Sequence, residues 1–104
     1  MTTLMIDRSL AEFEARASEA VGLLKSLANE KRLMILCKLL EAGEMNVTAL
    51  GEHVGLAQSA LSQHLARMRE EEIVDFRRDR QTIYYRVSNP AVGRVLKTLK
   101  SIYC

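Results

Sequence analysis

The stretch GLAQSALSQHLARMREEEIV, residues 55–74, joins a glycine to a polar helical segment and then to the start of an apolar strand. From Gln58 to Glu71, apolar residues recur every three or four positions, which is the spacing of side chains on one helix face. The inner face is expected to hold Leu61, Leu65 and Met68. The outer face is expected to hold Ser59, Ser62, Gln63 and Ala66. The sequence therefore predicts a helix packed on one side and covered by short polar side chains on the other.

A shorter helix is expected just before this one. Val47, Leu50 and Val54 indicate about two helical turns that stop at Gly55, a residue free to take a positive φ. Two short helices joined by a glycine turn form a helix-turn-helix unit, which we place at residues 46–71.

The pattern changes to β structure after Ile73. The segments IVDFRR and TIYYRV are rich in β-branched and aromatic residues, and the polar link DRQ separates them. This indicates a β-hairpin, or wing, over residues 73–87. The ten residues 77–86 carry four arginines against one aspartate, a net charge of +3, whereas residues 1–30 carry three basic and five acidic side chains. The hairpin is thus a local basic patch, as expected where a chain meets nucleic acid.

Three further amphipathic segments predict helices on either side of these elements. The first runs from Ser9 to Ser26, the second follows a cap at Asn29 and ends at Gly43, and the third opens at Asn89 and Pro90. Their expected apolar faces are Leu10, Phe13, Ala17, Val21 and Leu24; Leu33, Leu36, Cys37 and Leu40; and Val92, Leu96, Leu99 and Tyr103. The fold class predicted is mainly α with a small β-hairpin, a winged helix-turn-helix of five helices plus the wing, in one domain over residues 1–104.

Composition bounds the possible functions. The chain has 104 residues, 48% of them hydrophobic, which is enough for one core but not for two. No signal peptide is evident, and the longest uncharged apolar run, residues 33–37, is far too short to span a bilayer. We therefore expect a cytoplasmic protein without a membrane partner. In that reducing compartment, the two cysteines are not expected to form a permanent disulfide.

A helix that enters the major groove must bring polar side chains to base edges and phosphates. The candidate DNA-binding residues of the helix are Gln58, Ser59, Ser62, Gln63, His64 and Arg67. Those of the wing are Arg77, Arg78 and Arg80, which are expected to meet backbone phosphates or a narrow minor groove. The alternative for each residue alone is a solvated helix face, or a hairpin edge kept soluble by charge. The ordered set of short helix, glycine turn, polar helix and basic hairpin favours DNA binding.

The segment from LANEKRLMILCKLL to QTIYYRV resembles the ArsR family of dimeric winged-helix repressors, and QSALSQHLARMREEEIV is its most specific part. The resemblance implies repression of transcription that an inducer relieves. It also implies a homodimer built from residues 8–27 and 90–104.

The metal sites common in that family lack their ligands here. The segment EMNVTAL has Asn46 and Thr48 and no thiol, and the last helix, PAVGRVLKTLKSIYC, has no Asp, Glu or His. His53 and His64 are interpreted as solvated or facing DNA. We therefore expect no metal site and no cofactor.

Cys37 and Cys104 are the candidate sensing thiols. From the residues alone, Cys37 is equally well a small core residue and Cys104 an exposed end. The resemblance to the thiol-based subgroup of the family, which includes biofilm-associated repressors, implies that the two are oxidised or bridged by reactive sulfur species within one subunit, which lowers DNA affinity. Two alternatives stay open: a metal or metalloid sensor that uses both cysteines and a histidine across subunits, and a small persulfide-handling enzyme. Because no cysteine lies in a Gly-rich or Cys-x-x-Cys loop, we expect the chain not to be an enzyme.

Overall fold

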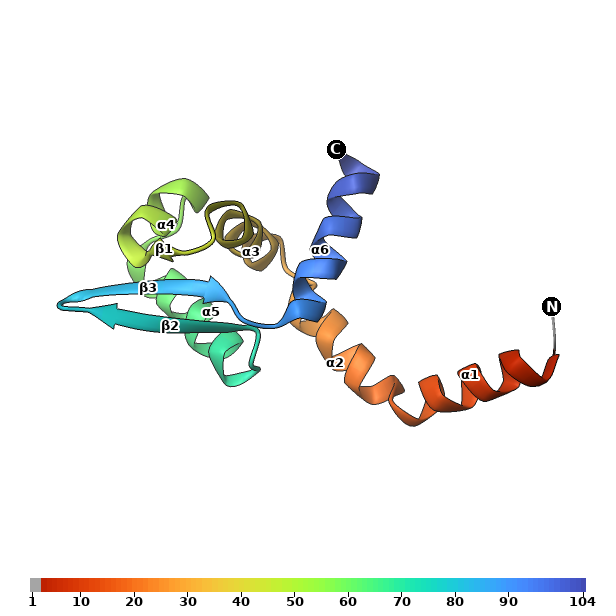
Figure 1. Ribbon diagram of the computed structural model, residues 1–104. Helices are drawn as coiled ribbons and strands as arrows, with labels where there is room; N and C mark the ends of the chain where they lie inside the picture. Colours follow the sequence, from red (N-terminus) through yellow and green to blue (C-terminus); the bar gives the residue numbers. More distant parts are fainter. Residues whose placement is uncertain (1–2) are drawn as a thin grey trace.

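The computed structural model describes the backbone of residues 3–104 and the side chains from residue 9 onward. The elements in chain order are α1 (Thr3–Ala15), α2 (Ala17–Leu27), α3 (Glu30–Ala42), β1 (Met45–Asn46), α4 (Val47–Val54), α5 (Gln58–Glu70), β2 (Val74–Asp79), β3 (Thr82–Val87) and α6 (Pro90–Tyr103). In Figure 1 the wing points to one side of the body and α1 extends away on the other. Among residues 3–104, no helix is both long enough and apolar enough to cross a membrane.

The core forms where α3, α4, α5 and α6 meet one another and the sheet. The predicted inner face of α5 is confirmed, because Leu61, Leu65 and Met68 are each at most 1% exposed. Other elements contribute Ile35, Leu36, Leu39, Leu50, Val92 and Leu96 to the same cluster. Burying a side chain of this size stabilises the fold by roughly 1.5–3 kcal/mol, so these contacts fix the rotation of α5 about its axis.

Three asparagines and two glycines set the helix ends. The caps at Asn29 and Asn89 and both glycine ends were predicted, whereas the cap at Asn46 was not. The side chains of Asn29, Asn46 and Asn89 accept hydrogen bonds from backbone N–H groups of α3, α4 and α6, at 3.1, 2.8 and 2.9 Å. Gly43 and Gly55 end α3 and α4 with φ of 85° and 65°, values that disfavour any residue with a Cβ. The turn between α4 and α5 is thereby fixed.

The predicted hairpin is confirmed, and the sheet holds one strand more than expected. The strand order is β1-β3-β2, all antiparallel, and Asp79 pairs with Thr82 so that Arg80 and Gln81 form the turn. The added strand β1 pairs Met45 with Tyr85. A strand of two residues is too short to show any periodicity, so the sequence pattern missed it.

The described residues form six helices, so the predicted count of five is wrong. The expected helix over 9–26 is broken at Arg16, where φ is −117° and ψ is 12°. The backbone N–H of Arg16 donates to the Phe13 carbonyl, and its guanidinium pairs with Glu19 at 2.6 Å. The apolar spacing continues across the break, and no Gly or Pro marks it. The sequence pattern therefore could not show where one helix ended.

The predicted apolar face of α3 is also partly wrong. Leu36 is buried as expected, but the innermost neighbours are Ile35 and Leu39, whereas Leu40 is exposed. The helix packs on α4 and the sheet and also on α6, so its buried stripe is wider than one face.

Two apolar stripes stay uncovered in the single chain. Leu10, Phe13, Val21 and Leu24 lie along α1 and α2, and each is about half exposed or more. Ile102 and Tyr103 at the end of α6 are 64% and 81% exposed. The spacing of these apolar residues predicted faces that pack against other elements. Little in the same chain covers them.

The backbone at Glu72 gives a test of the fold. Its φ of 60° lies in the left-handed region, which costs a residue with a Cβ about 1 kcal/mol or more. Glu72→Gly should therefore raise the free energy of unfolding by about 1 kcal/mol, measured by urea denaturation at a fixed protein concentration. The control Glu52→Gly, inside α4, should lower it by roughly 0.5–1 kcal/mol. Equal destabilisation by both glycines would contradict the conformation described at Glu72.

Candidate nucleic-acid interface

The outer face of α5 is an exposed row of short polar side chains. Burial of the opposite face turns Ser59, Ser62 and Gln63 into solvent, as the sequence predicted. The residue before the helix, Ala57, has no side chain able to cap it, so the N–H groups of the first turn of α5 are left for water or a ligand. Free N–H groups at a helix start attract anions. This end of α5 therefore combines hydrogen-bonding side chains with a positive backbone potential.

A polar groove connects α5 to the wing. It has a volume of about 280 Å³, and its polar lining comes from Asn46, Thr48, Gln58, Ser62, Gln81 and Thr82. Gln58 and Ser62 were predicted to act together, and the structure places them in one groove. The sequence analysis missed Gln81 and Thr82 as neighbours of α5, because only the folded hairpin brings β3 against the helix-turn-helix.

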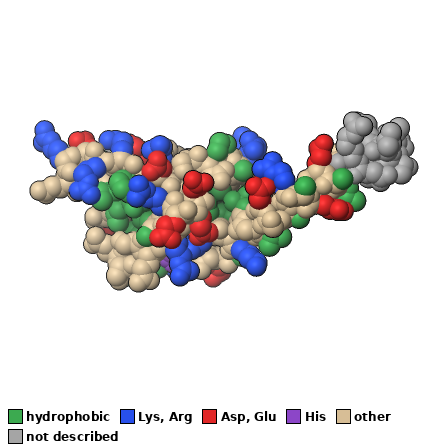
Figure 2. Space-filling model, turned by 90° about the horizontal axis from the view of Figure 1, so that it is seen from below, with side chains coloured by type: hydrophobic (Ala, Val, Ile, Leu, Met, Phe, Trp, Pro, Cys, Tyr) green, Lys and Arg blue, Asp and Glu red, His purple; other side chains and the backbone are tan. Residues whose placement is uncertain are grey.

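The wing carries its positive charge near the tip. Arg77 and Arg78 lie at the end of β2 and Arg80 in the turn, and all three are exposed. Figure 2 shows Lys and Arg side chains at the wing end of the molecule. Within the part of the chain that the structure describes, Arg78 and Arg80 have no acidic partner. Their charges are thus available to an external anion.

Arg77 differs from the other two wing arginines. Its Nε and Nη2 atoms donate to the carboxylate of Glu44 at 3.0 and 2.5 Å, and its guanidinium lies 4.5 Å from the centre of the Tyr84 ring. The hydrogen bond from Arg77 holds the pKa of Glu44 below its ordinary value. Arg77, which was predicted to contact a DNA phosphate, is therefore already paired with a carboxylate of the same chain.

His64 and Arg67 lie on the other flank of α5, away from the wing. His64 is half-buried and faces α2 and α3, where Arg32 is its neighbour. Burial, and then the positive charges of Arg32 and Arg67, lower the pKa of His64. The structure thus separates the predicted DNA-binding set into two groups, one beside the wing and one beside α3. No local pattern indicated that Arg32 would join the second group.

The two cysteines are free thiols at different depths. Cys37 is half-buried and lines a hollow of about 240 Å³ between α3 and α6, together with Lys97 and Lys100. Cys104 is exposed, and its backbone N–H donates to the carbonyl of Lys100 at 2.9 Å. Four residues, about 6 Å of helical rise, therefore separate Cys104 from Lys100, which lines the hollow of Cys37. Among residues 9–104, whose side chains the structure describes, no three His, Cys, Asp or Glu residues lie close enough to hold a metal ion.

The short helix α4, the glycine turn, the exposed polar helix α5 and the basic hairpin together define a winged helix-turn-helix protein. Residues 29–75 match the model of the family described as bacterial regulatory protein, arsR family. The HTH-type transcriptional regulator YgaV of Escherichia coli K12 is 45% identical over 95 residues, which cover 91% of this chain and 96% of YgaV. The chain belongs to the ArsR family of bacterial regulatory proteins and is a transcription regulator, not an enzyme.

Other relatives agree with that placement. The biofilm growth-associated repressor of Xylella fastidiosa (strain Temecula1) is 39% identical over 89% of this chain and 81% of its own length. The crystal structure of the transcriptional regulator HlyU from Vibrio vulnificus CMCP6 has a TM-score of 0.83 and 44% identity, covering 92% and 99% of the two chains. The structure of the antimony-specific transcriptional repressor AntR has a TM-score of 0.81 and 36% identity, covering 86% and 80%.

The ion pair between Glu44 and Arg77 gives a pH test. Because Arg77 favours the charged form of the carboxyl group, Arg77→Ala should raise the pKa of Glu44 toward its ordinary value. The pair should be intact at neutral pH and lost as pH falls through the lowered pKa. Carboxyl carbon NMR over an acid titration measures the shift, and Arg78→Ala serves as the matched control. An unchanged pKa of Glu44 in the Arg77 variant would contradict the pair.

Proposed function

We propose that this chain represses transcription as a homodimer that binds a pseudo-palindromic operator and releases it when Cys37 and Cys104 are oxidised or bridged by reactive sulfur species. The observation that carries the DNA-binding half is the exposed polar row of α5, held outward by a buried inner face and flanked by the wing. A second copy of the chain, duplex DNA and a sulfur electrophile or oxidant are the partners. No cofactor is required.

The uncovered apolar stripes support dimerisation through residues 8–27 and 90–104. They contain large side chains such as Phe13 on α1, Leu24 on α2 and Tyr103 on α6, all mostly exposed in the single chain. Burying such surface contributes about 25 cal/mol per Å², so a second copy would gain by covering it. A two-fold dimer would hold two α5 helices about 34 Å apart, the spacing of successive major grooves.

The residues of α5 and of the wing have different parts in this proposal. Gln58, Ser59, Ser62 and Gln63 reach base edges, where an amide can bond adenine through two hydrogen bonds. Arg77, Arg78 and Arg80 contact the backbone beside the groove and supply affinity for any sequence. His64 and Arg67 contact the DNA from the other flank of the same helix.

The position of the thiols supports sensing. Cys37 lines a hollow that also contains Lys97, Lys100 and one carboxylate, Glu41. The net positive charge of these three side chains favours an anionic sulfur reagent over a neutral one. A thiolate that attacks a polysulfide forms a cysteine persulfide and releases the shortened chain. The second thiolate then attacks the cysteine sulfur of that persulfide, expels HS⁻ and closes a disulfide, so that the polysulfide is the oxidant. Joining α3 to the end of α6 this way would strain the helix that also supports the dimer.

The likeness to the antimony-specific repressor AntR favours one alternative, a metalloid-responsive repressor of the same fold. Such a site would combine Cys37 and Cys104 with a histidine across two subunits. Equilibrium dialysis with Sb(III), As(III) and Zn(II) separates the two functions. Tight stoichiometric uptake by the reduced dimer would favour the metalloid sensor.

The DNA-binding half is tested with two kinds of variant. Gln63→Ala and Ser62→Ala should each cost about 1–3 kcal/mol of discrimination between operator and random DNA, because they remove contacts to bases. Arg80→Ala should weaken binding to both and reduce the slope of log affinity against log salt by about 1. Fluorescence anisotropy at several salt concentrations measures these effects. A chain that stays monomeric and shows no preference for any promoter fragment would contradict the proposal.

The sensing half is tested by treating the dimer with polysulfide before adding operator DNA. Operator affinity should fall about tenfold or more in the wild type, the usual range for coupled sites, and recover with a thiol reductant. Cys37→Ser and Cys104→Ser should each abolish the response to polysulfide. Both variants should bind the operator as tightly as the untreated wild-type protein. Intact-protein mass spectrometry identifies the sulfur bridge. Unchanged affinity of a fully bridged protein would refute sensing by this pair.

A further inference from the structure

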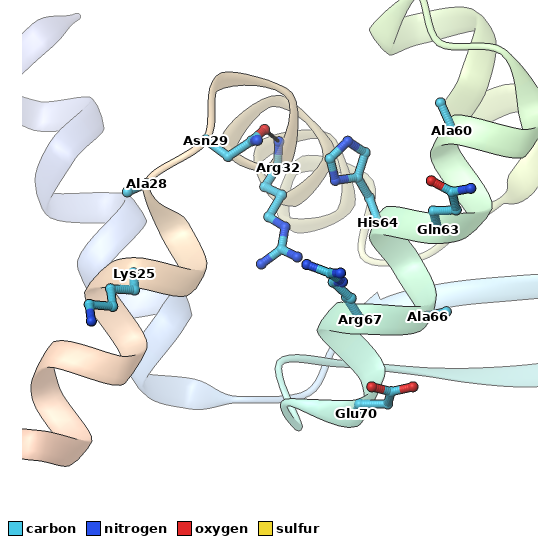
Figure 3. Close-up of a pocket in the computed structure, with 10 residues that line it drawn as sticks. All are labelled: Lys25, Ala28, Asn29, Arg32, Ala60, Gln63, His64, Ala66, Arg67 and Glu70. Carbon is cyan, nitrogen blue, oxygen red and sulfur yellow. Dashed lines mark hydrogen bonds between the residues drawn. The ribbon is translucent and has the colours of Figure 1, made fainter.

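A second, larger hollow lies on the flank of α5 that faces away from the wing. Its volume is about 840 Å³, and the end of α2, the start of α3 and the outer side of α5 enclose it. Its lining includes the side chains of Lys25, Arg32, Gln63, His64, Arg67 and Glu70. Figure 3 shows these side chains around the opening between α3 and α5.

The charges in this hollow are mostly of one sign. Lys25, Arg32 and Arg67 are cationic, and Glu70 is the one carboxylate among the lining residues. In Figure 3 the guanidinium groups of Arg32 and Arg67 point toward one another, whereas the carboxylate of Glu70 points away from them. Two cations that face each other repel unless an anion or water lies between them. An anion bound between the two guanidinium groups would offset this repulsion.

Arg32 is held in place before any ligand arrives. Its side chain is 11% exposed, and its Nη1 atom donates to the carbonyl of Ser26 at 3.0 Å and to the carboxylate of Glu71 at 3.3 Å. Arg67 has no acidic partner within the part of the chain that the structure describes. A fixed guanidinium opposite an unpaired one suits a tetrahedral oxyanion, because each planar fork can donate two parallel hydrogen bonds.

His64 reports the electrostatic potential of the hollow. The groups that face it are Arg67 and Glu70 from its own helix, Arg32 from α3 and Lys25 from α2. Burial first, and the nearby arginines second, hold the pKa of His64 below its ordinary value. An anion bound among the same groups would favour the imidazolium form and reverse part of that shift.

We propose that this hollow binds a phosphate group, gripped between Arg32 and Arg67 with Lys25 alongside. Its most direct source is the DNA backbone, a choice that rests on the proposed function. The wing arginines flank α5 on one side and this hollow flanks it on the other, so a helix lying in the major groove would carry cations toward both bordering strands. A free phosphate compound is the other source of the same chemistry.

The first arm of the test uses inorganic phosphate and no DNA. The chain has two histidines, and only His64 lines the hollow. In proton NMR titrations at matched ionic strength, phosphate in place of chloride should raise the pKa of His64 by about half a unit and leave that of His53 unchanged. Arg67→Gln should remove the phosphate-dependent part of the shift. This arm does not depend on whether the protein binds DNA.

The second arm measures the salt dependence of operator binding in the dimer. Lys25→Gln and Arg67→Gln should each lower the slope of log affinity against log salt by close to 0.9, the value for one lost phosphate contact. The matched control is Lys38→Gln, which removes one charge from α3 outside the hollow and should leave the slope nearly unchanged. Arg32 is left intact because it also anchors α2.

The outcomes separate the possible sources and the possible failures. Lower slopes in both variants identify a backbone phosphate, whereas a His64 shift with slopes like the control identifies a free phosphate compound. No shift of His64 together with unchanged slopes overturns the proposal, even if wild-type operator binding is normal. Absence of any operator binding by the wild type would refute the proposed function instead, and the histidine titration would still decide whether the hollow takes phosphate.

Discussion

The orientation of α5 depends on the burial of three side chains. Leu61, Leu65 and Met68 lie in the core with almost no exposure, and a rotation of the helix by one residue, about 100°, would pull them out. Each lost core contact of this size costs more free energy than any single polar contact on the outer face gains. Because the inner face is fixed so strongly, the outer face can be almost any polar sequence without loss of fold. The sequence of the exposed face of α5 can therefore vary, whereas its buried face keeps the helix in one orientation.

Helix α3 connects the features that the proposed function needs. It carries Cys37 on the side of α6 and Arg32 in its first turn. Arg32 contacts both the carbonyl of Ser26 in α2 and the carboxylate of Glu71 at the end of α5, and the hydroxyl of Ser26 also donates to that carboxylate. A displacement of α3 would therefore reach α2 and the end of α5 through the same few polar contacts. The link is physical and short, since each step is a direct hydrogen bond.

The sequence predicted what local physics decides. The caps at Asn29 and Asn89, the glycine ends, the inner face of α5 and the β-hairpin each follow from neighbouring residues, and the structure confirms them. The strand Met45–Asn46 was missed because pairing with β3 selects it and two residues show no periodicity. The break at Arg16 was missed because the apolar spacing continues across it and no Gly or Pro marks it. Gln58 and Ser62 were found from their spacing, but their grouping with Gln81 and Thr82 required the fold. Lys25 and Arg32 also join residues of α5 only in three dimensions, which is why the hollow beside them had no signature in the chain.

The pairing of Arg77 with Glu44 has a consequence for how such a protein would search a chromosome. A DNA-binding protein meets an enormous excess of random sites, and unrestrained positive charge would keep it there. An arginine already bonded to a carboxylate gains less from any chance phosphate, since it must first give up that partner. Only a complex in which the amide and hydroxyl side chains of α5 also form hydrogen bonds would offset the free energy of breaking the Arg77–Glu44 pair. In the proposed complex, the carboxylate of Glu44 would thus lower the affinity of Arg77 for the phosphates of random DNA.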